Sequence, residues 1–138
     1  MDMIIDFPGG SRVDAHFESL TVRTDQPVQA GGDRSAPTPF EIFLAALGTC
    51  AGIYVLGFCR QRNLPTEGIR LVQSVRMNPK TKLAEKIELD IQLPAEFPEK
   101  YQGAVIRAAE QCKVKKQFEY PPEVEVKTSV PNSGGSSL

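Results

Sequence analysis

Two cysteines, Cys50 and Cys112, are the residues of this chain whose chemistry is most informative. A thiolate is a nucleophile, and two thiols that the fold brings close together can form a disulfide. Cys50 lies within residues 42–59, which carry no charged side chain. A thiol in such apolar surroundings is either an inert part of the core or a sheltered reactive group. The residues alone leave both interpretations open.

The third cysteine, Cys59, is excluded as a disulfide partner of Cys50. Nine residues of helix turn the side chain by about half a turn and raise it by about 13 Å, whereas a disulfide needs Cα atoms within about 7 Å. We therefore interpret Cys59 as a buried bystander and Cys112 as the candidate partner of Cys50 within the chain. Helical periodicity falters after Cys112, and a new helical turn there would offer N–H groups and the three lysines of residues 113–116 to a thiolate.

Other kinds of catalytic or metal chemistry find little support in the sequence. The single histidine, His16, falls on the polar phase of its strand, so we expect a surface histidine and propose no Cys–His dyad. The spacing of cysteine and histidine matches no metal site, and no glycine-rich loop is arranged to hold a phosphate. We therefore expect neither a metal nor a cofactor.

Length and composition indicate a single domain over residues 1–130, followed by a flexible tail over residues 131–138. The chain has 138 residues, which is within the usual range for one domain. A net charge of −1 and a pI of about 5.9 argue against nucleic acid or an anionic membrane as a partner. The N-terminus shows no signal peptide, so we expect a cytoplasmic protein whose three cysteines are thiols at rest.

The pattern of apolar residues predicts an α+β fold with antiparallel strands. Alternation predicts strands at residues 4–7, 13–18, 20–22, 69–77, 86–93 and 124–130. A second helix follows Phe97-Pro98, and its apolar stripe ends at Cys112.

A long helix is predicted from Thr38 to about residue 62. Thr38 at the N-cap, Pro39 at the first helical position and Glu41 at the third form a capping box. The apolar segment is at the lower limit for a membrane span, and we prefer a core helix that is buried on all sides. Gly48 and Gly52 would let another helix approach closely, either the second helix of the same chain or, as we prefer, the same helix in a homodimer.

The sequence resembles the OsmC/Ohr family of osmotically inducible and organic hydroperoxide resistance proteins. The resemblance lies in Asp25-Gln26-Pro27, Gly31-Gly32, residues 37–50 (PTPFEIFLAALGTC) and residues 108–114 (AAEQCKV). The resemblance covers about residues 1–130. Within the family, the chain resembles the less characterised OsmC-like branch.

The resemblance implies an intertwined homodimer in which antiparallel sheets wrap around long central helices. It further implies a thiol peroxidase that acts on small organic hydroperoxides. Cys50 would attack the peroxide, Cys112 would resolve the sulfenic acid, and a dithiol such as a lipoylated protein would reduce the disulfide. The alternative is a non-catalytic protein of the same fold that binds an apolar ligand or senses redox state.

The chain departs from the family pattern around the thiolate. The resemblance implies an arginine after a Gly-Gly hairpin and a glutamate directly after the capping proline. Here Arg12 lies one position late after Gly9-Gly10, and Phe40 takes the place of the glutamate. We expect Arg12, or else Arg23, to lie near Cys50 and lower its pKa. Three residues are predicted to line the substrate pocket: Phe40, Ile53 and Tyr54.

Overall fold

The structure is a computed structural model that describes residues 1–131 and confirms the α+β class. A three-stranded antiparallel sheet is followed by a long helix, a two-stranded antiparallel sheet and two short helices. The elements are β1 (Ile4–Gly9), β2 (Arg12–Phe17), β3 (Leu20–Thr24), α1 (Pro39–Gln61), β4 (Arg70–Met77), β5 (Ala84–Gln92), α2 (Gln102–Glu110) and α3 (Lys113–Glu119). Short 3-10 turns lie at Val28–Ala30 and Glu99–Tyr101.

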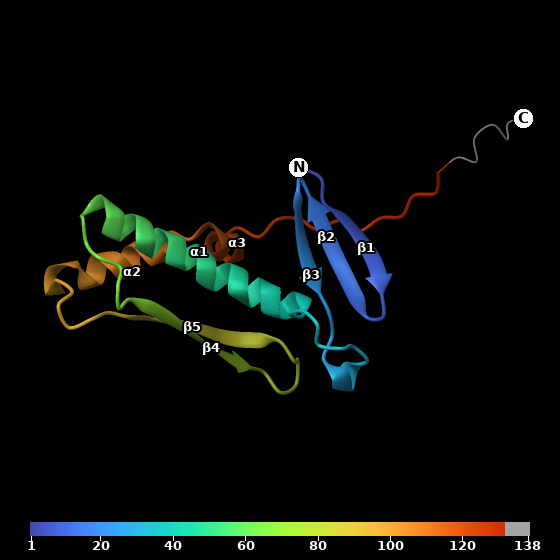
Figure 1. The fold of residues 1–138 in the computed structure, drawn as a ribbon, viewed down its shortest axis with the longest axis horizontal. Helices are drawn as coiled ribbons and strands as arrows, with labels where there is room; N and C mark the ends of the chain where they lie inside the picture. Colours follow the sequence, from blue (N-terminus) through green and yellow to red (C-terminus); the bar gives the residue numbers. More distant parts are fainter. Residues whose placement is uncertain (132–138) are drawn as a thin grey trace, which may run out of the picture.

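The N-terminal strands form a meander whose first turn requires glycine. β1 pairs with β2 and β2 with β3, both antiparallel. At that turn Gly9 has φ 144° and Gly10 has φ 58°, which residues with a Cβ rarely adopt. Figure 1 shows this sheet beside the N-terminal end of α1, apart from the body that α1 forms with β4 and β5.

Helix α1 begins at the predicted capping box. The Glu41 N–H donates to Thr38 Oγ1 at 3.2 Å, and the Thr38 N–H donates to Glu41 Oε1 at 2.9 Å. Both Nη atoms of the Arg34 guanidinium also donate to the Glu41 carboxylate, and this ion pair links the preceding loop to the helix start. The helix ends at Gln61, before Leu64-Pro65.

The core lies on the side of α1 that faces β4, β5 and α2 (Figure 1). One stripe of α1 supplies Leu47, Ala51, Val55, Phe58 and Cys59, and the chain after β5 supplies Phe97, Val105, Ala109 and Cys112. Strand β5 turns its alternate apolar residues toward this core, as its predicted period of two requires.

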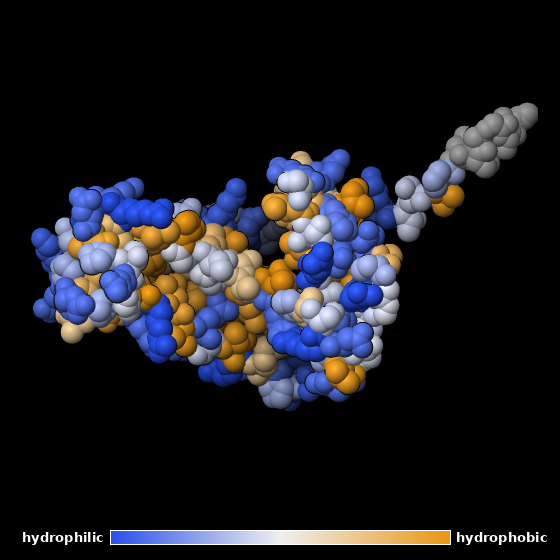
Figure 2. Space-filling view, viewed as in Figure 1, coloured by the Kyte–Doolittle hydropathy of each residue, from blue (hydrophilic) through white to orange (hydrophobic). Residues whose placement is uncertain are grey.

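The opposite side of α1 is open in the single chain, so burial of the helix on all sides, which was predicted together with a homodimer, stays a prediction. Ala45, Thr49 and Ile53 are exposed, and Figure 2 shows apolar side chains on the surface in this region. The physical reason is that one two-stranded sheet and two short helices cover only one side of a 23-residue rod. Within residues 1–131, α1 is the one helix long and apolar enough to cross a membrane by length and composition.

The predicted last strand at residues 124–130 is wrong for the single chain. Residues 121–131 have no regular secondary structure and are exposed. A strand needs a neighbour for its N–H and C=O groups, and this segment runs past the three-stranded sheet (Figure 1) without joining its ladder. The predicted flexible tail, apart from Pro131, falls outside the described residues.

Candidate functional site

The fold brings Cys50 and Cys112 together, although the two lie far apart in the sequence. Cys50 is half-buried on α1, and Cys112 is fully buried at the junction of α2 and α3. The Cys112 thiol donates to the Leu47 carbonyl oxygen at 3.9 Å, and it lies close enough to Cys50 for each thiol to shift the pKa of the other. Both cysteines are free thiols in the structure, so the pair corresponds to the reduced form of a dithiol.

The N-terminus of α3 is directed at both sulfur atoms. Cys112 is its N-cap residue, with φ −49° and ψ 126°, and Cys112 Sγ accepts a hydrogen bond from the Lys115 N–H at 3.4 Å. The N–H groups of Lys113 and Val114 face Cys50 instead. These are the donors that a helix leaves unpaired in its first turn, so the helix offers them to the thiols.

This arrangement separates the pKa values of the two thiols. Burial by itself raises the pKa of Cys50, but the Val114 N–H, the Cys112 thiol, and the N–H and charge of Lys113 together bring it below its usual value. Burial, followed by the hydrogen bond with Cys50, raises the pKa of Cys112. Cys50 is therefore the better thiolate, and Cys112 remains the protonated donor beside it.

Cys59 has the character predicted for a bystander. It is fully buried, and burial raises its pKa, with only a partial offset from the nearby charge of Arg62. A thiol that is both inaccessible and hard to ionise is a poor nucleophile.

Aromatic rings lie on the N-terminal side of Cys50. Phe43, on the same face of α1 as Cys50, stacks on Phe40 with ring centroids 5.7 Å apart, and it meets the edge of Phe118 at the same distance. Phe40, which was predicted to line the substrate pocket, belongs to this aromatic cluster. Its role in substrate binding stays a prediction. Phe118 comes from α3, so the helix that supplies the N–H groups also supplies apolar cover.

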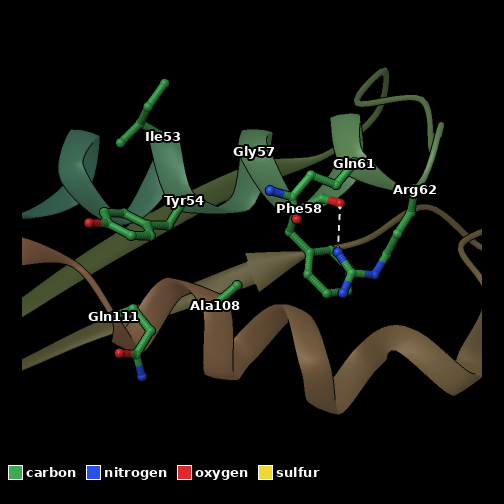
Figure 3. Close-up of a pocket in the computed structure, with 8 residues that line it drawn as sticks. All are labelled: Ile53, Tyr54, Gly57, Phe58, Gln61, Arg62, Ala108 and Gln111. Atoms are coloured by element: carbon green, nitrogen blue, oxygen red, sulfur yellow. Dashed lines mark hydrogen bonds between the residues drawn. The ribbon is translucent and has the colours of Figure 1, made fainter.

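A groove lies on the C-terminal side of Cys50, between α1 and α2 (Figure 3). Its volume is about 530 Å³. Figure 3 shows Tyr54 and Gln111 toward one end and Arg62 at the other. The predicted pocket residues Ile53 and Tyr54 both line it. The full lining is Ile53, Tyr54, Gly57, Phe58, Gln61, Arg62, Ala108 and Gln111.

The two arginines predicted to support Cys50 are placed elsewhere within the chain. Arg12 lies on β2, where its Nε donates to the Gly9 carbonyl oxygen at 3.2 Å. Arg23 lies on β3, opposite Asp14 of β2. Among residues 1–131, the charge that lowers the pKa of Cys50 belongs to Lys113. A catalytic role for Arg12 stays a prediction.

Sequence reasoning missed the residue that organises the loop before α1. Asp25 is fully buried, and its carboxylate accepts hydrogen bonds from Gln26 N–H at 2.7 Å, Ser35 N–H at 2.9 Å and Ser35 Oγ at 2.6 Å. The hydrogen bonds from Ser35, followed by that from Gln26, lower the pKa of Asp25 to about 2. An aspartate before a loop rich in glycine and proline was the available signal.

One group of side chains on the N-terminal sheet has the geometry of metal ligands. Asp6, Asp14 and His16 place ligand atoms within 4.8 Å of one another. His16 Nε2 already contacts Asp6 Oδ1 at 3.1 Å, and its Nδ1 contacts Thr21 Oγ1 at 3.0 Å. These contacts already occupy both ring nitrogens of His16. The cluster lies on the three-stranded sheet, whereas the sheet that packs beside the thiols is the two-stranded one. The expectation of no metal stays a prediction.

Comparison with known protein families gives one clear result. The model of the family described as OsmC-like protein matches residues 31–127, which include α1, both strands of the second sheet and both thiols. A search of curated proteins found no match to the sequence.

Solved structures share the fold at low sequence identity. A protein from Psychrobacter arcticus, named for osmotic stress induction and detoxification, is 21% identical with a TM-score of 0.71, over 83% of this chain and 85% of its own. An organic hydroperoxide resistance protein from Legionella pneumophila is 18% identical with a TM-score of 0.51, over 86% and 89%. A Vibrio cholerae protein named for organic hydroperoxide resistance, with captopril bound in one of its active sites, is 15% identical with a TM-score of 0.54, over 88% and 86%.

Proposed function

Because the chain belongs to the OsmC-like protein family, we propose that it is a thiol-dependent peroxidase that reduces organic hydroperoxides. The observation that carries this proposal is the pairing of Cys50, whose pKa is lowered, with Cys112, whose pKa is raised. A peroxidase of this type needs a thiolate that attacks and a protonated thiol that waits beside it.

In the first step the Cys50 thiolate attacks one oxygen of the hydroperoxide. An S–O bond forms, the O–O bond breaks, and the alkoxide leaves as an alcohol after taking a proton from water. Cys50 is thereby oxidised to a sulfenic acid. The N–H groups of Lys113 and Val114 hold the thiolate before the attack, since donors at a helix N-terminus favour negative charge.

In the second step the Cys112 sulfur attacks the Cys50 sulfenic acid. An S–S bond forms, the S–O bond breaks, and the hydroxide leaves as water with the proton of Cys112. One hydroperoxide and two thiols thus give one alcohol, one water and one disulfide. An external dithiol, for which a lipoylated protein is our candidate, then restores both thiols by exchange.

Apolar surroundings support organic hydroperoxides over hydrogen peroxide as substrates. The aromatic cluster and the groove flank Cys50 along one face of α1. Their apolar surface adds binding energy only for a substrate that carries an alkyl or aryl group. The Legionella and Vibrio proteins of this fold, which are named for organic hydroperoxide resistance, agree with this choice.

We also propose that the working form is a homodimer built on the open face of α1. Gly52 has no atom within 4 Å of where a Cβ would be, so a second helix backbone has room to approach. Gly48, by contrast, faces Gln73 of β4, which leaves it to packing within the chain. The unpaired segment 121–131 and the separate N-terminal sheet are further surface that a partner would cover. Sedimentation at micromolar concentration tests this proposal, and a monomer of about 15 kDa would contradict it.

Peroxide consumption in the presence of a dithiol tests the enzymatic proposal. Wild type should consume cumene hydroperoxide, and Cys50→Ser should not. Cys59→Ser is the matched control and should retain activity. Peptide mapping after one equivalent of peroxide should find the Cys50–Cys112 disulfide with Cys59 still reduced. If wild type consumes no peroxide although Cys50 oxidises, redox sensing takes the place of turnover; if Cys50 does not oxidise at all, the ligand-binding alternative remains.

A further inference from the structure

The cluster of Asp6, Asp14 and His16 lies on the three-stranded sheet, outside the site of the thiols. Asp6 of β1 is directly opposite Asp14 of β2 in the ladder, and His16 follows Asp14 on the same face of β2. The carboxylate and imidazole atoms of these side chains lie within 4.8 Å of one another. His16 Nε2 and Asp6 Oδ1 are 3.1 Å apart. Two carboxylates and one imidazole therefore converge on one small region of the surface.

The negative charges of this cluster lack close cations. Two carboxylates directly opposite each other in an antiparallel ladder repel. Arg23 of β3 is the ladder partner of Asp14, yet among residues 1–131 Asp14 forms no ion pair. Asp6 contacts His16, whose ring carries a charge only when it is protonated. A divalent cation would neutralise both carboxylates at once.

Thr21, which is not itself part of the cluster, holds the imidazole in an orientation suited to a metal. It is the ladder partner of His16 on β3, and its Oγ1 lies 3.0 Å from His16 Nδ1. Metal-binding histidines commonly donate their second ring N–H to an oxygen, which fixes the tautomer and the ring orientation. When Nδ1–H donates to Thr21, the Nε2 lone pair faces Asp6 Oδ1, which is also an acceptor. A cation between these two atoms would remove their repulsion.

We propose that Asp6, Asp14 and His16 bind one zinc ion, with Thr21 as the residue that positions the imidazole. Zinc bonds to nitrogen and to carboxylate oxygen are about 2.0–2.2 Å long, so two ligand atoms of a tetrahedral site lie about 3.4 Å apart. The 3.1 Å between His16 Nε2 and Asp6 Oδ1 is close to that distance, and rotation of the Asp14 side chain would bring in the third ligand. The imidazole favours zinc over Mg²⁺ and Ca²⁺, which prefer oxygen ligands.

The ion would link two strands of a sheet that has little else to stabilise it within the chain. Among residues 1–131, the hydrophobic core takes no side chain from β1, β2 or β3. A metal that binds only the folded protein increases its stability as the metal concentration rises. The spacing of the residues in the sequence did not indicate this site, because strand pairing brings the ligands together and they match no local metal motif.

Calorimetric titration with zinc chloride tests the proposal on protein without a polyhistidine tag. The titrations use the Cys50→Ser/Cys112→Ser protein, so that the paired thiols do not compete for zinc. One zinc ion should bind per chain, and Mg²⁺ should bind at least about tenfold more weakly. His16→Gln and Asp14→Asn should each weaken zinc binding about tenfold or more. Asp2→Asn is the matched control and should leave the affinity unchanged, since Asp2 is an exposed carboxylate outside the cluster.

Two further measurements distinguish a built site from general attraction to acidic side chains. Thr21→Val keeps all three ligands and should weaken zinc binding about tenfold, because it removes the contact with His16 Nδ1. His16 is the only histidine of the chain, so its ring signals in NMR spectra report on this site alone, and they should shift as zinc is added. Zinc should also raise the Tm of the parent protein and leave that of His16→Gln unchanged.

All of these metal-site variants change side chains outside the core, so each should fold without zinc, and the Tm of the metal-free protein checks this. Zinc binding to His16→Gln as tight as to the parent would overturn the proposal, and so would equal effects of Asp2→Asn and Asp14→Asn. Parental affinity in Thr21→Val would also contradict it. A parent protein that binds no zinc and whose His16 signals do not move would show that the cluster is held by its own hydrogen bonds alone.

Discussion

Replacing Lys113 by proline should remove one of the groups that stabilise the Cys50 thiolate while leaving the fold intact. Lys113 is the first residue of α3, where proline is well tolerated because its missing N–H would be unpaired within the helix. Cys112, before it, already has the extended conformation that a residue before proline requires, with φ −49° and ψ 126°. The change therefore removes a donor that faces Cys50 and adds no backbone strain.

The expected effect on reactivity is about tenfold at neutral pH. A hydrogen bond to a charged group contributes about 1.5–3 kcal/mol, and we take the lower end because Cys50 is half-buried and partly solvated. About 1.4 kcal/mol corresponds to a factor of ten in the thiolate population. Lys113→Pro also removes a charge that lowers the pKa of Cys50. Lys113→Ala, which removes the charge and keeps the N–H, is the matched control.

The assay is the rate of Cys50 alkylation by iodoacetamide as a function of pH, with the modified site identified by mass spectrometry. In wild type the rate should rise with pH through a pKa below that of an ordinary thiol, because deprotonation creates the nucleophile. Lys113→Pro should shift that rise to higher pH, further than Lys113→Ala does. If the two variants have the same profile and the same melting temperature, the N–H groups of α3 do not hold the thiolate and the electrostatic account of the site is wrong.

Four other substitutions test the fold. Gly32→Ala should destabilise the protein severely in urea denaturation, because its Cβ would lie 2.1 Å from the Gln26 carbonyl oxygen. Gly57→Ala should stabilise the protein by up to about 1 kcal/mol, because alanine is the better helix former and no atom lies within 4 Å of the position of its Cβ. Val105→Ala should cost about 2 kcal/mol in the same assay, since Val105 is fully buried in the core. The ionised Asp25 side chain should contribute its full stabilisation above about pH 4 and lose it as the pH falls through about 2, because its pKa in the folded protein is depressed. Asp25→Asn should remove this part of the acid dependence of stability, as measured by thermal melting between pH 2 and 5.

Local signals in the sequence were enough to predict most of the elements. The capping box at Thr38 and Glu41 is a short-range interaction, and the structure forms both of its hydrogen bonds. Strict alternation in β5 reflects one face on the core and one in water, which a single strand displays by itself. The apolar stripe that ends at Cys112 also predicted correctly that this thiol points into the core.

Features that depend on another part of the molecule could not be predicted in the same way. Residues 124–130 alternate like a strand, but alternation does not reveal whether a neighbouring strand exists. Among residues 1–131, none pairs with this segment. The uncharged stretch of α1 indicates burial without indicating what buries each face. The guanidinium of Arg62 lies at the groove because it stacks on the ring of Phe58, one helical turn earlier. No distinctive sequence pattern marks that contact.

The groups that lower the pKa of Cys50 are those that the sequence predicted for a new helical turn after Cys112. They include the N–H groups of Lys113 and Val114, in the short helix that Cys112 caps, and the charge of Lys113. The arginine that the resemblance implies stays a prediction. Cys112 therefore has two tasks, because the residue that would resolve the sulfenic acid also fixes the start of the helix that activates Cys50. Formation of the disulfide would remove the thiolate that those N–H groups face, and Cys112 Sγ would become a weaker acceptor for Lys115. On the proposed mechanism, α3 should therefore be held less firmly in the oxidised protein than in the reduced protein. Oxidation would remove the reactive thiolate of Cys50 and weaken the docking of α3, and reduction would restore both.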